Sequence, residues 1–179
     1  KVIQNVPAIP SSANILQADA RRITPEASNL IYCTDPPYYD NIHYADISDF
    51  FYVWHKMNLS EIYLKLFSTI QTPKLGELIA NQFTKNSKKE EELLFLNGMK
   101  EVILKMAERN NSELPVCFFY AFKQQESGTD GTSSTGWSTF LEATISSGFN
   151  IVGTIPMRTE QSTKLLGKNA NILSTSAVL

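Results

Sequence analysis

The chain has 179 residues, a formal net charge of −2 and a hydrophobic content of 42%. This length and composition suffice for one globular domain, and no apolar run approaches the roughly 20 residues that span a membrane. The small negative charge excludes a strongly basic nucleic-acid module, because nonspecific DNA affinity comes mostly from neutralising phosphates. No signal peptide is visible, so we expect a cytoplasmic protein without a membrane segment.

The two cysteines, Cys33 and Cys117, each lie inside an apolar run. Neither has the paired spacing of a zinc site, and together they do not form the framework of a secreted mini-protein. We therefore interpret both as buried thiols in a reducing compartment, and we predict no metal site.

The segment Asp35-Pro36-Pro37-Tyr38 follows directly after the apolar run 30–34. That run contains β-branched and aromatic residues and predicts a central strand of a parallel sheet. Ligands of open α/β sheets bind beyond the carboxyl ends of the strands, where Asp35 lies. The prolines fix φ and leave the Pro36 carbonyl able to point outward, so Asp35 and this carbonyl offer two acceptors to an –NH2 group. The Tyr38 ring could stack on the base that carries the amine.

The sequence from Thr34 to Trp54, TDPPYYDNIHYADISDFFYVW, resembles the amino-methyltransferase motif of large adenine-specific DNA methylases that also carry a zinc ribbon. A second block, residues 136–149 followed by GTIPMRTE at 153–160, is similar to the end of the same catalytic domain. Both blocks occur in the expected order, which makes the resemblance more specific than the four-residue motif alone. It implies a Rossmann-like methyltransferase fold that uses S-adenosylmethionine and acts on DNA.

The activity that the resemblance implies is methyl transfer to the exocyclic N6 amine of an adenine flipped out of the duplex. Asp35, Pro36, Pro37 and Tyr38 would then be catalytic, with Asp35 also contacting the cofactor. The connection 157–173 contains no Phe, Tyr or Trp to cover the second face of the base, which leaves Tyr39 or Tyr44 for that role. The expected substrate-binding residues are Tyr38, Tyr39, Asn41, His43, Tyr44 and Arg158. A structural role for His43, or a surface ion pair of Arg158 with Glu160, is the simpler alternative for those residues.

Residues 14–18 predict a strand that ends at Asp19 and Ala20. An acidic residue at this strand end fits the family position that accepts the amine of the cofactor's adenine. The resemblance thus implies that Asp19 and Ala20 bind the cofactor. Asp19 could equally cap the following turn, and the sequence leaves both roles open.

Such methyltransferases hold S-adenosylmethionine with a glycine-rich loop after the first strand. In this chain, no predicted strand is followed by such a loop. The closest glycine cluster, residues 128–132, is typical of a flexible loop. The chain also begins at Lys1 and stops within the apolar run 176–179. We therefore expect residues 1–179 to be part of a catalytic domain, with an upstream cofactor-binding half of the same polypeptide as its partner.

Several helices follow from apolar periodicity. A helix over about 46–57 is predicted by apolar residues at i, i+3, i+4 and i+7, namely Ile47, Phe50, Phe51 and Trp54. These residues form a largely aromatic stripe, which we expect to lie in the core. Asn58 and Glu61 predict a second helix through about 67, and residues 75–80 have weak helical content. A long amphipathic helix is predicted over about 88–109, and another from Trp137 that ends at Gly148.

The strands predicted for the second half are 115–122, 149–155 and 174–179. The first is apolar almost throughout, which indicates a parallel strand covered on both faces, and the loop 123–135 after it should open at the same edge as Asp35. The predicted fold class is α/β, a doubly wound and mostly parallel sheet that is incomplete in this chain. The resemblance implies that its last strand runs antiparallel between its neighbours.

Two alternatives to adenine methylation remain open. The acceptor could be another planar amine, such as cytosine N4, RNA or a protein amide, because the same acceptor and ring geometry serves any of them. Alternatively, the chain could be a noncatalytic scaffold that keeps the fold without the cofactor loop.

Overall fold

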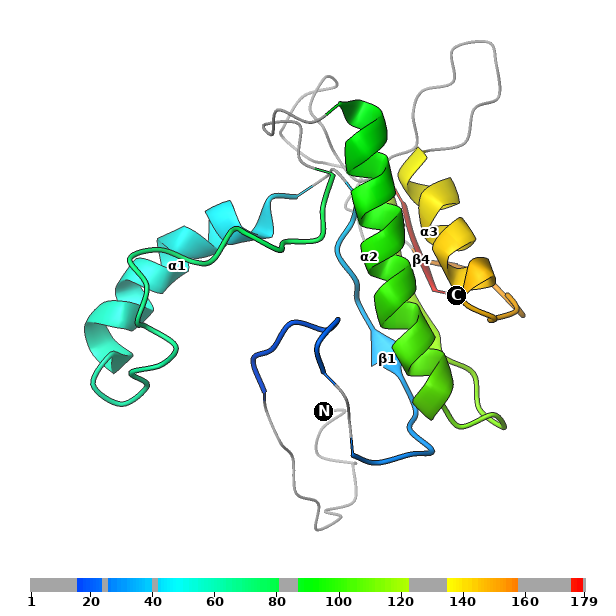
Figure 1. Ribbon diagram of the computed structural model, residues 1–179, viewed down its shortest axis with the longest axis horizontal. Helices are drawn as coiled ribbons and strands as arrows, with labels where there is room; N and C mark the ends of the chain where they lie inside the picture. The colour runs from blue at the N-terminus through cyan, green and yellow to red at the C-terminus, as the bar shows by residue number, and fades with distance from the viewer. Residues whose placement is uncertain are drawn as a thin grey trace.

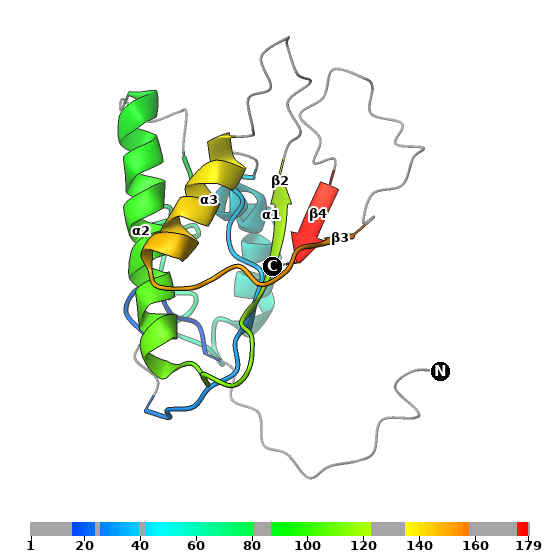
Figure 2. The same ribbon diagram turned by 90° about the vertical axis from the view of Figure 1, so that its right-hand side faces the viewer.

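The computed structural model describes residues 16–23, 26–39, 42–80, 87–122, 135–157 and 175–178. In this part of the chain it shows a mixed α/β arrangement of three helices and four strands. Helices α2 (Lys88–Arg109) and α3 (Thr135–Ser146) pack side by side, whereas α1 (Tyr44–Leu59) projects away from them (Figure 1). Figure 2 shows α2 and α3 on one side of the strands.

The sheet has the strand order β1-β2-β4-β3. Strand β1 (Cys33–Thr34) runs parallel to β2 (Cys117–Phe122), with Cys33 opposite Cys117. Strand β4 (Thr175–Val178) runs antiparallel to both β2 and β3 (Ile155–Met157). The expected last strand, antiparallel between its neighbours, is therefore confirmed.

Three predicted strands differ from the structure. The run 30–34 pairs regularly only at Cys33–Thr34, with one bridge from Leu30 to Asn110, and in the described residues it lies at the sheet edge instead of the centre. The strand predicted for 149–155 begins only at Ile155, whose register partner is Val178 of β4. Residues 16–18 form no strand, since nothing in the described residues pairs with them before the chain turns at Asp19.

Helix α2 has the predicted bounds and contributes four residues to the core. Ser87 caps its start, because the Ser87 side chain accepts from the Glu90 N–H while the Glu90 carboxylate accepts from the Ser87 N–H at 2.7 Å. Its apolar stripe faces α3 and β2 and is buried as predicted at Phe95, Met99, Ile103 and Met106. From α3, Phe140 stacks on Tyr120 of β2 at 4.4 Å between ring centroids. Gly148 has φ 92 after α3, as its predicted place beyond the helix end requires.

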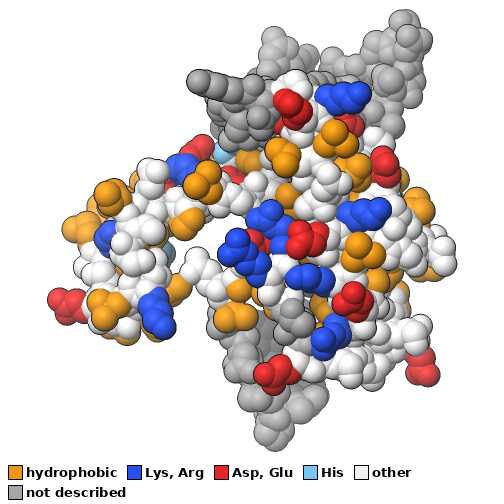
Figure 3. All heavy atoms as spheres, in the orientation of Figure 1, with side chains coloured by type: hydrophobic (Ala, Val, Ile, Leu, Met, Phe, Trp, Pro, Cys, Tyr) orange, Lys and Arg blue, Asp and Glu red, His pale blue; other side chains and the backbone are white. Residues whose placement is uncertain are grey.

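The aromatic stripe of α1 is not in the core, which corrects the prediction. No residue of α1 is buried, and its stripe is largely exposed, at Ile47 57%, Phe50 66%, Phe51 55% and Trp54 57%. Figure 3 shows hydrophobic side chains along this projecting part of the molecule. Periodicity identified the helix correctly, but it could not reveal that nothing in the described residues packs on the stripe.

The start of α1 is held by the segment 72–77. The Ala45 N–H donates to the Glu77 carboxylate at 3.1 Å, and Lys74 pairs with both Asp46 and Asp49 at 2.7 Å. Residues 60–67 form turns instead of the predicted second helix, and 75–80 are not helical either. Asn58 does not start a helix, because it lies within α1 and its side chain donates to the Trp54 carbonyl.

The face of the sheet opposite α2 and α3 is partly open. Phe119 of β2 is 38% exposed, so the prediction of a strand covered on both faces is wrong. Cys33 is exposed and Cys117 half-buried, which also corrects the prediction of two buried thiols. Among the described residues, no helix is long and apolar enough to cross a membrane. The predicted loop 123–135 lies outside the described residues except for Thr135.

Candidate functional site

The Asp-Pro-Pro-Tyr segment lies at the carboxyl end of β1, as the sequence predicted. The Tyr38 hydroxyl donates a hydrogen bond to Oδ1 of Asp35 at 2.5 Å. The Tyr38 ring packs edge-on against Tyr44 and Tyr120, with centroid distances of 6.4 and 5.6 Å. Tyr120 belongs to the core, so the ring of Tyr38 links the motif to the packed centre of the molecule.

Burial and hydrogen bonding keep this phenol in its neutral form. Burial raises the pKa of Tyr38 above its ordinary value, and the hydrogen bond to Asp35 raises it further. Burial also raises the pKa of Tyr44. Both hydroxyls are therefore donors near neutral pH, and the Asp35 carboxylate is the acceptor in this cluster.

A cavity of about 350 Å³ lies beside this cluster. It gathers five residues that the sequence analysis singled out, together with Ile42: Asp35, Pro36, Pro37, Tyr38 and Tyr44. This volume is at the lower end of the range for ligand sites, about 300–1,000 Å³. A single planar ring fits such a cavity, with aromatic side chains and a carboxylate on its border.

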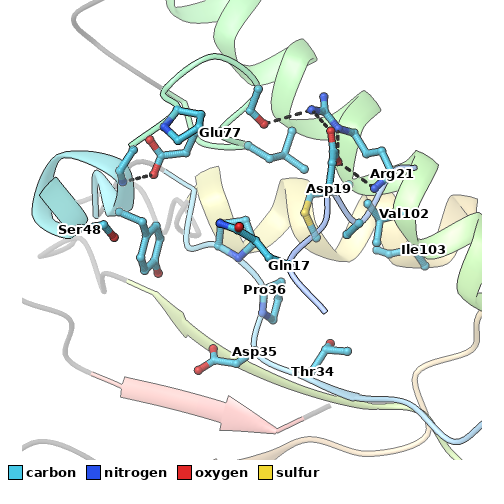
Figure 4. Close-up of a pocket in the computed structure, with 18 of the residues that line it drawn as sticks. Gln17, Asp19, Arg21, Thr34, Asp35, Pro36, Ser48, Glu77, Val102 and Ile103 are labelled. Atoms are coloured by element: carbon cyan, nitrogen blue, oxygen red, sulfur yellow. Dashed lines mark hydrogen bonds and ion pairs between the residues drawn. The ribbon is translucent and has the colours of Figure 1, made fainter. Parts of the chain in front are cut away.

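A second cavity of about 660 Å³ (Figure 4) has part of its border in common with the first. The two cavities share Asp35, Pro36, Pro37 and Tyr44. The predicted cofactor residues Asp19, Ala20 and Asp35 all line the larger one. Its remaining wall is largely apolar and comes from α2, β2 and the segment before α2, with Leu78, Met99, Val102, Ile103, Met106 and Phe118 among its members. Two ligands, one in each cavity, would meet at Asp35.

Asp19 shapes the wall of the larger cavity by capping a turn, which is one of the two roles that the sequence left open. Its carboxylate accepts from the backbone N–H and from the guanidinium of Arg21, at 2.8–3.0 Å. These hydrogen bonds, the side-chain one foremost, lower the pKa of Asp19 to about 2. Arg21 also donates to the Gly76 carbonyl at 3.1 Å, and thereby ties this turn to the opposite wall.

Thr34, the last residue of β1, is a further residue of the site that the motif alone does not predict. Its hydroxyl is buried and has no hydrogen-bond partner in the structure, and the residue lines the larger cavity. A buried hydroxyl without a partner is costly, so it is a natural contact for a polar ligand group. Its place as the last residue of β1, directly before Asp35, is the signal that could have identified it. The size of the cavity, its apolar wall and this unpaired hydroxyl together fit a nucleoside-like cofactor.

Tyr39 does not belong to the site, contrary to its predicted role. Only 6% of the residue is exposed, and its ring packs edge-on against Phe95 in the core at 5.2 Å. Its φ of 25 turns the chain inward directly after Tyr38. His43 is half-buried at the start of α1 and borders neither cavity. Asn41 and Arg158 lie outside the described residues.

Comparisons of the chain with protein-family models, with curated proteins and with solved structures gave no significant match.

Proposed function

We propose that this chain carries the acceptor site of an S-adenosylmethionine-dependent methyltransferase that methylates the N6 amine of adenine in DNA. The observation that carries the proposal is the pair of adjoining cavities that share the Asp35-Pro36-Pro37 border. Methyl transfer needs a donor and an acceptor held in line at one point, and such positioning supplies much of the rate enhancement. The order β1-β2-β4-β3, with β4 antiparallel, supports the Rossmann-like methyltransferase arrangement implied by the resemblance.

The smaller cavity would hold the flipped adenine. Tyr38 and Tyr44 offer ring surface to it, while the Asp35 carboxylate and the Pro36 carbonyl accept the two hydrogens of the N6 amine. Accepting these hydrogens draws electron density onto nitrogen as it becomes tetrahedral. The proton that the amine releases after methylation would pass to the Asp35 carboxylate, which is its nearest base.

The larger cavity would hold the cofactor, which supplies the electrophilic methyl group when bound. Asp35 and Thr34, which both line this cavity, would be polar contacts for the cofactor. Met99, Val102 and Ile103 of α2 form an apolar wall against which an adenine ring could pack. The Asp19 carboxylate already accepts from Arg21, so it stabilises the wall and has little capacity left for a further donor.

The adenine amine would share the Asp35 carboxylate with the Tyr38 hydroxyl or displace that hydroxyl from it. Oδ1 of Asp35 accepts from the Tyr38 hydroxyl in the structure, and the adenine amine would compete for the same carboxylate. The exchange replaces one hydrogen bond with another, so its net cost is small compared with that of leaving Asp35 unpaired. It also leaves the Tyr38 ring free to adjust against the base.

The test is Asp35→Ala in a protein that contains this chain together with the cofactor-binding half that the resemblance implies. We expect methylation of duplex DNA to fall by two to three orders of magnitude, because one preorganised polar contact to a transition state contributes about 2.7–4 kcal/mol. Folding should be unchanged, since Asp35 is exposed. The matched control is Glu108→Ala, which removes an exposed carboxylate at the far end of α2.

Radiolabelled methyl transfer to duplexes whose flipped base is adenine or cytosine identifies the acceptor. Undiminished methylation by a folded Asp35→Ala protein would refute the proposal. Transfer to cytosine alone would move the activity to the N4 amine. The absence of transfer to either base by the wild-type protein would favour the scaffold alternative.

A further inference from the structure

The two cysteines of the chain form a pair across the parallel strands. Cys33 of β1 and Cys117 of β2 are direct partners in the ladder, and the Cys117 N–H donates to the Tyr32 carbonyl at 3.0 Å beside them. Partners in a ladder carry their side chains on the same face of the sheet. The two thiols are thus neighbours on one face of the sheet.

This pair lies on the open face of the sheet. The next pair in register, Thr34 and Phe118, points the opposite way, and Phe118 packs on Phe140 of α3 at 5.4 Å between ring centroids. The cysteines therefore lie on the face turned away from α3, as does the partly exposed Phe119. Cys33 is exposed, so a small thiol reagent can reach it directly.

We propose that Cys33 and Cys117 are a redox-active dithiol, which a disulfide oxidant of the glutathione class converts reversibly into a cross-strand disulfide. Neighbouring strands lie about 4.8 Å apart. Disulfides join Cα atoms separated by about 4.4–6.8 Å, so the spacing allows the bond without a large movement of the strands. Both cysteines are free thiols in the structure, which corresponds to the reduced state.

The two thiols have different roles in the reaction. The exposed Cys33 thiolate attacks one sulfur of the oxidant, forms a mixed disulfide and releases one glutathione thiolate. Cys117 then loses its proton, attacks the Cys33 sulfur and releases the second glutathione thiolate. Two electrons pass from the cysteines to the oxidant, and their two protons are taken up by the released thiolates. Burial raises the pKa of Cys117, which favours Cys33 as the first nucleophile and Cys117 as the resolving thiol.

The bond would join β1 to β2 two residues before Asp35. It would also close a long loop that contains α1 and α2, and disulfides that close long loops restrict the unfolded chain most. The oxidised protein should therefore unfold at a higher temperature than the reduced one. This expectation does not depend on the proposed methyltransferase activity.

The experiment incubates the reduced chain with oxidised glutathione, blocks the remaining thiols by alkylation and measures the intact mass. We expect a monomer that has lost two hydrogens, and a peptide map in which the segments around Cys33 and Cys117 are joined. Dithiothreitol should restore both thiols. Thermal unfolding of the oxidised and reduced forms should show the rise in melting temperature.

Two variants separate the roles of the thiols. Cys117→Ser should accumulate the glutathione mixed disulfide at position 33, whereas Cys33→Ser should react far more slowly. Alkylation rates in the wild-type protein, which require no variant to fold, should show Cys33 reacting first. The proposal is overturned if the wild-type chain stops at a mixed disulfide as Cys117→Ser does, if it forms only dimers, or if Cys117 is alkylated as fast as Cys33.

Discussion

Asp35 and Tyr38 share one hydrogen bond in the structure, and their separate contributions to function can be distinguished by substitution. The hydroxyl of Tyr38 donates to Asp35, while its ring packs edge-on against Tyr44 and Tyr120. A phenylalanine keeps the ring contacts and releases the carboxylate, whereas an alanine removes both. The two substitutions therefore test whether the ring or the hydroxyl acts on substrate.

We expect Tyr38→Phe to retain most methyl transfer and Tyr38→Ala to lose binding of the target base. Stacking on a base is worth roughly 1–3 kcal/mol and does not require the hydroxyl. Kinetics on duplex DNA should be compared with binding to a duplex whose target adenine is mispaired. Mispairing lowers the cost of flipping, so it should partly rescue Tyr38→Ala. Equal losses in the two variants would show instead that methyl transfer requires the phenolic hydroxyl of Tyr38 and not its ring alone.

At the scale of elements, the site depends on how tightly α3 packs against the chain that follows the motif. Gly136, near the start of α3, is buried against Tyr39. A Cβ added there would lie 2.7 Å from the Tyr39 Cβ and 3.0 Å from its Cγ. Tyr39 is itself held in the core by Phe95, so it cannot easily move aside. The close approach of α3 therefore requires glycine at this position.

Gly136→Ala should destabilise the protein by about 1–3 kcal/mol, the usual cost of overpacking a core. Helix propensity alone predicts the opposite sign, a gain of up to about 1 kcal/mol. Urea unfolding, followed by circular dichroism, decides between them. Gly153→Ala is the control, because a Cβ there meets nothing within 4 Å. If Gly136→Ala were as stable as this control, the contact between α3 and Tyr39 would be looser than described.

The sequence predicted elements best where a local pattern and the tertiary contacts agree. Helix α2 has the predicted bounds because its amphipathic stripe meets α3 and β2. In α1 the same kind of stripe is exposed, since periodicity shows that residues share a face but not what covers that face. The motif predicts Tyr39 in the site, whereas in the structure Tyr39 has a positive φ and lies in the core. Asp35, Pro36, Pro37, Tyr38 and Tyr44 came together as expected, because the motif fixes its own local backbone.

At the scale of the whole molecule, the described fold brings two cavities together at Asp35. The larger one has an apolar wall from α2 and polar groups at Thr34 and Asp35. A cofactor that carries a ribose and a methionine also needs several backbone donors at close range. Glycine-rich loops supply these in dinucleotide-binding folds, because the backbone can approach the ligand closely.

This chain should therefore bind S-adenosylmethionine weakly or not at all. Its first glycine is Gly76, which follows α1, so no glycine lies in the region that leads to the motif. The larger cavity offers a surface for the adenine ring, but micromolar binding requires about 8 kcal/mol, which the hydroxyl of Thr34 and an apolar wall do not supply. Isothermal titration calorimetry is the measurement, with Thr34→Val as the variant that removes the unpaired hydroxyl. Binding at micromolar affinity or better by the wild-type chain would show that the cofactor site is complete within these 179 residues. In that case a further loss in Thr34→Val would place the cofactor in the larger cavity.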